Sequence, residues 1–130
     1  MRSAISLILL IFAMFLPQSA SFAANWKPVS PGFIDNYYDV DSIVRTKSGI
    51  VKFWLRSENM ERQLNGKKII TMINRQELRC AQREVRITHI LFYFEDNTNW
   101  SSEFDETEFE SIAPGTLAEQ LYKKLCRPVK

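Results

Sequence analysis

The clearest strand signal in this sequence is REVRITHILFYF, residues 83–94. Polar and apolar side chains alternate along it, which is typical of a β-strand with one face toward a core. This period of two places Val85, Ile87, Leu91 and Tyr93 on one face and Glu84, Arg86 and Thr88 on the other. Beyond residue 90 both faces are apolar, so we predict the longest strand of the protein here, central in a sheet at its C-terminal half.

Further strand signals lie on both sides of this segment. Residues 37–45 and 50–56 flank Thr46-Lys47-Ser48-Gly49, which predicts a hairpin because glycine supplies the positive φ of such a turn. Residues 57–64 are polar and are expected to form an exposed connection to a strand over 69–73. The polar residues 96–99 predict a second hairpin, into residues 100–104.

The C-terminal segment changes period from two to about 3.6. Thr116 and Glu119 have the spacing of a capping box, and Leu117, Leu121 and Leu125 recur at every fourth position. We therefore expect an amphipathic helix packed on the sheet. The predicted fold class is α+β, mainly an antiparallel sheet of about six strands with a packed C-terminal helix and one disulfide.

The N-terminus has the order of a secretory signal peptide. Arg2 precedes an apolar run over residues 4–16, and small side chains at Ser21 and Ala23 favour cleavage after Ala23. An uncleaved anchor is the alternative, but the run is shorter than the roughly 20 residues that span a bilayer. We predict a signal peptide over residues 1–23 and one domain over 24–130, exported and without a transmembrane segment once the signal is removed.

Two cysteines, Cys80 and Cys126, are the only ones in the chain. An even number of cysteines in an exported protein points to a disulfide, and only one intrachain pairing exists. A metal site or a reactive thiolate is less well supported, because there is no CxxC motif and His89 is the single histidine. We expect a structural Cys80–Cys126 disulfide and no metal site.

The charges are balanced overall but unevenly distributed. Lys and Arg number 17 against 15 acidic residues, so no global field favours nucleic acid as a partner. Residues 45–86 hold eleven basic side chains against four acidic ones, whereas residues 95–110 hold seven acidic and no basic ones. Solvated strand faces and loops would account for this asymmetry.

No catalytic constellation is visible in the sequence. His89 is expected as a partly buried histidine with one hydrogen-bond partner. Asp39 and Asp41 could pair as two carboxylates on one strand face, but aspartates at strand ends commonly serve turns. The acidic run over residues 104–110 lacks the glycine and the ligand spacing of an EF-hand loop. We therefore expect a protein that is not an enzyme.

The order of these features resembles the surface-adhesin protein E family of exported bacterial envelope proteins. The resemblance rests on Trp26, on the segments YYDVDSIVR (37–45) and GIVKFWL (49–55), on Cys80 followed by Arg83, and on IAPGTLAE (112–119) before Leu125-Cys126. It implies a six-stranded antiparallel sheet with a packed helix and an envelope protein of Gram-negative bacteria. The family's namesake is an outer-membrane lipoprotein that binds host vitronectin and laminin and also haem, so binding of these ligands is an alternative for this chain.

Two features depart from the family pattern. No cysteine lies near the predicted cleavage site, so there is no acceptor for a lipid anchor, and Phe109 stands where the pattern often has a tryptophan. Surface display does not follow from the resemblance alone. The periplasm is the expected location, with the cell surface or secretion as alternatives.

Three functional hypotheses follow. The first is an exported, non-enzymatic envelope protein, expected in the periplasm, that binds an unknown protein or small ligand. The second is a surface adhesin that binds host matrix proteins, with the basic strands as the contact: Arg75, Arg79, Arg83 and Arg86. The third is haem binding through His89, although no cofactor is expected from the residues themselves.

Overall fold

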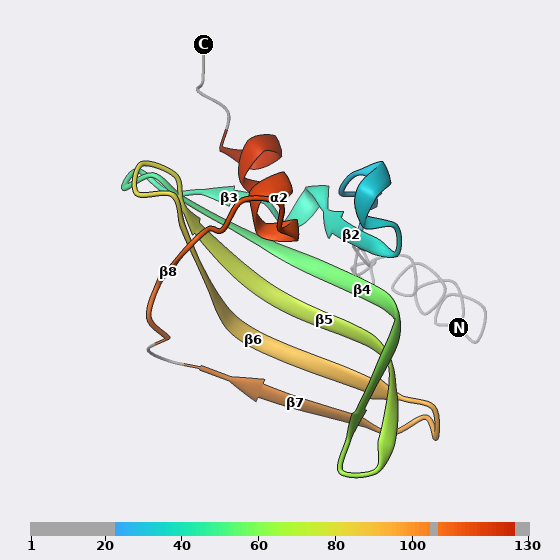
Figure 1. The fold of residues 1–130 in the computed structure, drawn as a ribbon. Coiled ribbons are helices and arrows are strands. Elements are labelled where there is room, and N and C mark those ends of the chain that lie inside the picture. The colour runs from blue at the N-terminus through green and yellow to red at the C-terminus, as the bar shows by residue number, and fades with distance from the viewer. Residues whose placement is uncertain (1–22, 105–106, 127–130) are drawn as a thin grey trace, which may run out of the picture.

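An antiparallel eight-stranded sheet makes up most of the computed structural model, which describes residues 23–104 and 107–126 (Figure 1). Its main order is β1-β2-β4-β5-β6-β7, with β3 beside β4 and β8 beside β6. The strands are β1 (Trp26–Pro28), β2 (Asn36–Asp39), β3 (Val44–Arg45), β4 (Ile50–Leu64), β5 (Lys67–Arg79), β6 (Glu84–Phe94), β7 (Asn99–Glu103) and β8 (Glu110–Ser111). Two 3-10 turns, η2 (Pro31–Phe33) and η3 (Val40–Ser42), and the helix α2 (Leu117–Leu125) complete the described elements. The predicted fold class is confirmed.

The predicted hairpin around Gly49 is present, but its first strand is divided. Val44 of β3 pairs with Lys52 of β4, and Gly49 has a φ of 82° in the turn between them. The expected strand over 37–45 breaks into β2, η3 and β3. The break occurs because the Asp39 carboxylate accepts a hydrogen bond from the backbone N–H of Asp41, which caps η3 instead of continuing the strand.

The exposed connection predicted for residues 57–64 is wrong, because these residues continue β4. β4 and β5 stay paired to Leu64↔Lys67, across a turn in which Asn65 and Gly66 both have positive φ. Such an Asn-Gly turn favours a tight two-residue hairpin, and the pairing of its two strands is interrupted only by a register shift between Glu58 and Arg62. Most of the polar side chains in residues 57–64, the distal arm of β4, are exposed, so the composition of this segment resembles that of a loop.

The strand over 83–94 is confirmed as β6, but its two faces were predicted wrongly. Gln76 pairs with Ile87 and Arg75 with His89, so one extra residue, Thr88, stands opposite this step of β5. A bulge of this kind shifts every later side chain of the strand to the opposite face of the sheet from the one that simple alternation predicts. Ile87 therefore faces the helix, while His89 and the residues that follow it at period two face away. β6 is also shorter than β4 and β5, so it is not the longest strand.

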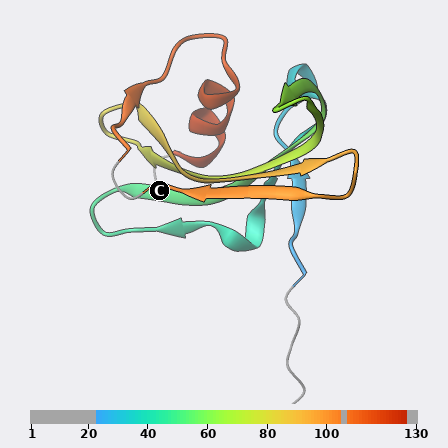
Figure 2. The ribbon, with the colours of Figure 1, turned by 90° about the horizontal axis from the view of Figure 1, so that it is seen from below.

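The helix α2 covers one face of the sheet, which we call the covered face. Leu121 and Leu125 of α2 are buried, and they pack in one cluster with the inward side chains of β4 and β5. The buried members of this cluster are Val29, Val51, Phe53, Leu55, Leu78, Ile112, Leu121 and Leu125. Figures 1 and 2 show α2 and η2 on this same side of the sheet. The opposite side is called the open face.

The N-terminal cap of α2 matches the prediction with one difference. Thr116 Oγ1 accepts a hydrogen bond from the Glu119 N–H at 3.3 Å, as in a capping box. The Glu119 carboxylate accepts its reciprocal bond from the Gly115 N–H at 2.8 Å rather than from Thr116. This bond lowers the pKa of Glu119, against a smaller opposing effect of desolvation.

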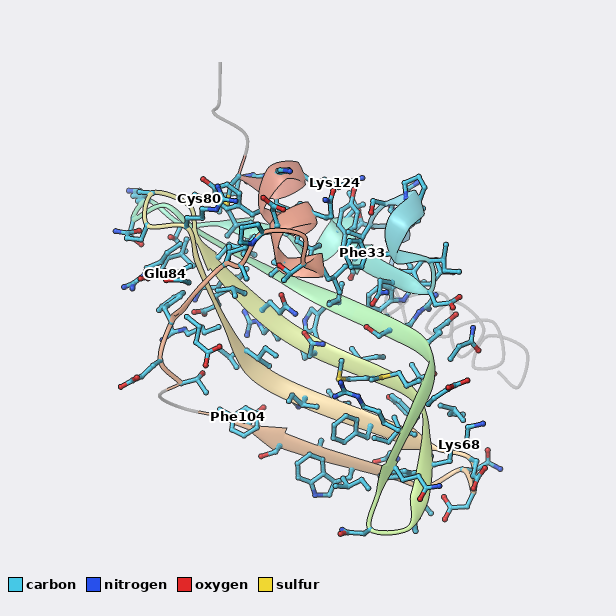
Figure 3. All side chains as sticks on the ribbon, viewed as in Figure 1. Phe33, Lys68, Cys80, Glu84, Phe104 and Lys124 are labelled. Atoms are coloured by element: carbon cyan, nitrogen blue, oxygen red, sulfur yellow. A yellow bond between two sulfur atoms is a disulfide. The ribbon has the colours of Figure 1, made fainter. Side chains whose placement is uncertain are left out.

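The predicted disulfide joins Cys80, after β5, to Cys126 at the end of α2, with 5.5 Å between their Cα atoms. Figure 3 labels Cys80 at the end of the sheet near the helix. Among the described residues, no helix is long and apolar enough to cross a membrane. The predicted signal peptide lies, apart from Ala23, outside the described residues, so its cleavage stays a prediction.

Candidate binding face

Three rows of side chains cross the open face, because the pairing of β4, β5 and β6 aligns their residues, with the Thr88 bulge between the first and second rows. The first row is Lys52, Glu77 and Arg86, the second is Trp54, Arg75 and His89, and the third is Arg56, Ile73 and Leu91. Each row brings together residues that lie far apart in the sequence. Charged and aromatic side chains thus share one surface, with Ile73 and Leu91 as the aliphatic members of the third row.

The first row is an ion-paired cluster around Glu77, which is only 5% exposed. Lys52 Nζ lies 3.3 Å from one carboxylate oxygen, and Arg86 donates to the other from Nε at 2.7 Å. Burial alone would raise the pKa of Glu77, but hydrogen bonds from Arg86 and Lys52 and their positive charges outweigh it and lower the pKa. Because the folded-state pKa is lowered, this carboxylate stabilises the fold above its unfolded pKa and loses that effect as the pH falls.

Arg86 and its neighbour Arg79 are also held by an aromatic ring. The two guanidinium carbons lie 4.3 and 4.1 Å from the centre of the Phe109 ring, as expected for cation–π contacts. Arg79 pairs in addition with Glu84. Phe109, which precedes β8, is therefore held against the arginines of β5 and β6. A phenylalanine ring is sufficient for this contact, so a tryptophan is not required at this position.

The second row has Arg75 at its centre. The rings of Trp54 and His89, on the strands at either side of Arg75, approach to 5.3 Å between centroids. His89 Nδ1 lies 3.4 Å from the exposed carboxylate of Glu103 on β7. Arg75 itself is exposed, and no carboxylate of the described residues pairs with it. Among the open-face cations in the described part of the chain, Arg75 is the one without a carboxylate partner.

The third row ends in an arginine between two aromatic rings. The guanidinium carbon of Arg56 lies 4.8 Å from the Trp26 ring centre and 4.9 Å from that of Tyr37. Glu58 lies 3.1 Å from the Arg56 Nε. These contacts fix β1 and β2 against β4 and extend the aromatic surface to the edge of the sheet.

The structure does not bring the four predicted arginines together as one basic patch. Arg75 and Arg86 lie on the open face and Arg79 at its end, but Arg83 lies in the turn before β6 and pairs with Glu119 of α2 at 2.7 Å. Arg79, Arg83 and Arg86 each have a carboxylate partner. Their role in binding stays a prediction, and the geometry singles out Arg75 among them.

The other residues considered for chemistry occupy structural positions. Asp39 accepts hydrogen bonds from the backbone of Asn25 and of Asp41, in keeping with a turn role. The acidic run over 104–110 lies partly outside the described residues. No group of three His, Cys, Asp or Glu side chains that could hold a metal occurs in residues 23–104 and 107–126. Haem binding by His89 stays a prediction.

Sequence reasoning missed Glu77 and the aromatic partners of Arg56. Glu77 reads as an ordinary polar residue until β5 is known to extend to Arg79, which places it between Lys52 and Arg86. Trp26 and Tyr37 are visible as aromatic residues in the sequence. Their convergence on Arg56 depends on the pairing of three strands, which no local pattern reports.

Comparison with known proteins decides the family. The family model for surface-adhesin protein E matches residues 24–127. This chain belongs to the surface-adhesin protein E family. The resemblance predicted from the sequence is thereby confirmed, and membership implies an exported envelope or surface protein. No curated protein sequence matches the chain closely enough to add a relative.

Solved structures support the same fold for this family member. One structure of Haemophilus influenzae protein E matches with a TM-score of 0.56 and 16% identity, covering 85% of this chain and 92% of that one. Protein E from non-typeable Haemophilus influenzae matches with a TM-score of 0.54 and 15% identity, covering 85% and 81%. At such low identity, the likeness concerns the fold.

Proposed function

We propose that this family member is an exported, non-enzymatic envelope protein that binds a protein partner through the open face of its sheet. Family membership supports the export and the adhesive role. It also supports a non-enzymatic function, because surface adhesins are not a class of enzyme. The composition of the open face supports the mode of binding. Tryptophan, tyrosine and arginine are the residues most often found at the energetic centres of protein interfaces.

The observation that carries this proposal is the environment of Arg75. It is exposed, and it has no carboxylate partner in the described part of the chain. Its position on β5 is flanked by Trp54 on β4 and His89 on β6, whose rings contact each other. Each of the other cations described on this face contacts a carboxylate: Lys52 and Arg86 share Glu77, Arg79 pairs with Glu84, and Arg56 pairs with Glu58. A partner carboxylate would therefore gain most by pairing with Arg75.

Two locations fit this role. In the periplasm, the partner would be another envelope protein, and this is the reading we favour because the sequence has no acceptor for a lipid anchor near the predicted cleavage site. At the cell surface, the partner would be a host matrix protein. Protease treatment of intact cells, compared with cells whose outer membrane has been opened, distinguishes the two.

The adhesin alternative is tested by binding of the purified domain, residues 24–130, to immobilised vitronectin and laminin. If the open face is the contact, Arg75→Glu should weaken binding at least tenfold, and 0.5 M salt should weaken binding of the unmodified chain. Arg62→Glu, at an exposed position on the β4 arm, is the matched charge reversal and should change affinity little. Equal loss in both variants would refute a specific role for Arg75.

A further inference from the structure

A groove lies between residues 28–35, which include η2, and the helix α2, at the β1–β2 edge of the sheet. Its volume is about 620 Å³, within the range of small-molecule sites. The residues that line it are Pro28, Val29, Ser30, Pro31, Ile34, Asp35, Tyr37, Gln120, Lys123 and Lys124. Both views of the ribbon show η2 and α2, which supply its walls, on the same side of the sheet (Figures 1 and 2).

The wall from the N-terminal turn is apolar. Val29 is fully buried, whereas Ile34 is 75% exposed, the highest value among the exposed large hydrophobic residues that the structure describes. The turn that presents Ile34 ends at Asp35, whose φ of 67° reverses the chain into β2. An isoleucine held at the edge of a groove offers apolar area that a ligand could remove from water.

The wall from the helix is cationic. Lys123 and Lys124 lie in the last turn of α2, and Figure 3 shows Lys124 on the side of the helix toward η2. Lys123 is largely exposed and lies 3.6 Å from Glu119, while Lys124 lies 5.5 Å from the Tyr38 ring centre. The lining has two lysines and one carboxylate, Asp35. Glu119, outside the lining, pairs with Lys123, and no carboxylate of the described residues pairs with Lys124, so Lys124 is the cation most available to an anionic head.

We propose that this groove binds a small anionic amphiphile, a molecule with one acyl chain or apolar ring and a carboxylate or phosphate head. The apolar part lies against Pro31 and Ile34, where it replaces water on exposed hydrocarbon. The anionic head lies at the helix end, near Lys123 and Lys124. A free fatty acid and a single-chain phospholipid share this chemistry, and both occur in a bacterial envelope.

The test is calorimetric titration of the purified domain with three C12 probes, all below their micelle concentrations. Dodecanoate represents a free fatty acid, dodecyl phosphate a lipid head, and dodecyl maltoside a neutral amphiphile. We expect saturable binding at one site for at least one of the two anionic probes, at least tenfold tighter than for the neutral probe. Whichever anion binds more tightly indicates the source of the ligand.

Variants locate the site. Lys124→Glu and the double variant Lys123→Glu/Lys124→Glu should weaken the anionic probes at least tenfold, and Ile34→Asp should weaken all three. The control is Lys47→Glu/Lys68→Glu, a matched reversal of two exposed lysines, one in the turn before β4 and one at the start of β5. Far-UV circular dichroism and the melting temperature establish that each variant is folded. Because the open face is untouched, failure here leaves the proposed protein contact standing.

Several outcomes would overturn this assignment. They are absence of binding by both anionic probes at 1 mM, non-saturable binding, or equal binding of the anionic probes by the lysine variants and the control. Tighter binding after removal of residues 127–130 would mean that the end of the chain is the natural occupant. A probe that dissociates a dimer on sedimentation would identify a second copy as the occupant.

Discussion

At the residue scale, two buried amides are the least satisfied groups of the covered face. Asn74 is fully buried and Gln76 is 8% exposed, and the Gln76 Nε2 donates to the Asn74 Oδ1 at 2.9 Å. The Asn74 Nδ2 and the Gln76 Oε1 have no partner in the described part of the protein. If the oxygen and nitrogen positions of both amides are exchanged, two amide atoms still lack a hydrogen-bond partner. The unpaired atoms therefore do not depend on how the amides are oriented.

We predict that the two amides are energetically coupled. Gln76→Met or Asn74→Leu alone leaves the remaining amide buried without its partner and should lower the free energy of unfolding by about 1–3 kcal/mol. The double variant removes every unpaired group and should be close to the unmodified protein. Urea denaturation of all four proteins measures the coupling, with exposed Gln63→Met as the control. Additive losses would mean that each amide has its own partner, such as a bound water.

At the element scale, α2 is stable only as part of the sheet. It has nine residues, fewer than an isolated helix needs in water, so its buried face and its cap maintain it. Leu121 is fully buried among core residues of β4 and β5. The helix in turn holds Arg45 of β3, whose guanidinium donates to the Leu125 carbonyl.

Leu121→Asp should therefore destabilise the domain severely. The change removes a buried side chain, a loss of about 2–5 kcal/mol for leucine truncations, and adds a charge with no partner. Thermal unfolding followed by circular dichroism measures it. Lys123→Gln, at an exposed position of the same helix, should stay within about 0.5 kcal/mol of the unmodified protein. Wild-type stability of Leu121→Asp would show that this helical face is not buried.

At the scale of the whole molecule, one covalent link joins the sheet to the helix. The Cys80–Cys126 disulfide closes a loop with a sequence separation of 46, which includes β6, β7, β8 and all of α2. Constraining such a loop removes conformations from the unfolded chain rather than adding contacts to the folded one. In the entropy model, this stabilises the fold by about 4 kcal/mol, a large share of the stability of a small domain.

Reduction should accordingly lower the melting temperature of residues 24–130 by roughly 15 °C or more, given 4–8 °C per kcal/mol for a domain of this size. Differential scanning calorimetry with and without reductant measures the shift. The double variant Cys80→Ala/Cys126→Ala should melt at the temperature of the reduced protein and no longer respond to reductant. An unchanged melting temperature on reduction would exclude the link as a source of stability.

Local patterns in the sequence were sufficient for the elements whose signals are local. The Gly49 turn, the period of α2 from Leu117 to Leu125 and the cysteine pair each predicted what the structure contains. The reason is that turn geometry, helical period and pairing of two cysteines depend on few residues. Even the resemblance to the family rests on such short motifs, and it was correct.

The tertiary structure alone decided which side chains meet. The bulge at Thr88 turned His89 to the open face, and strand pairing placed Glu77 between Lys52 and Arg86. Side-chain alternation cannot report a one-residue shift against a partner strand, because register is a property of two strands. For the same reason, the open face around Arg75 and the groove beside α2 became visible only once distant segments were packed together.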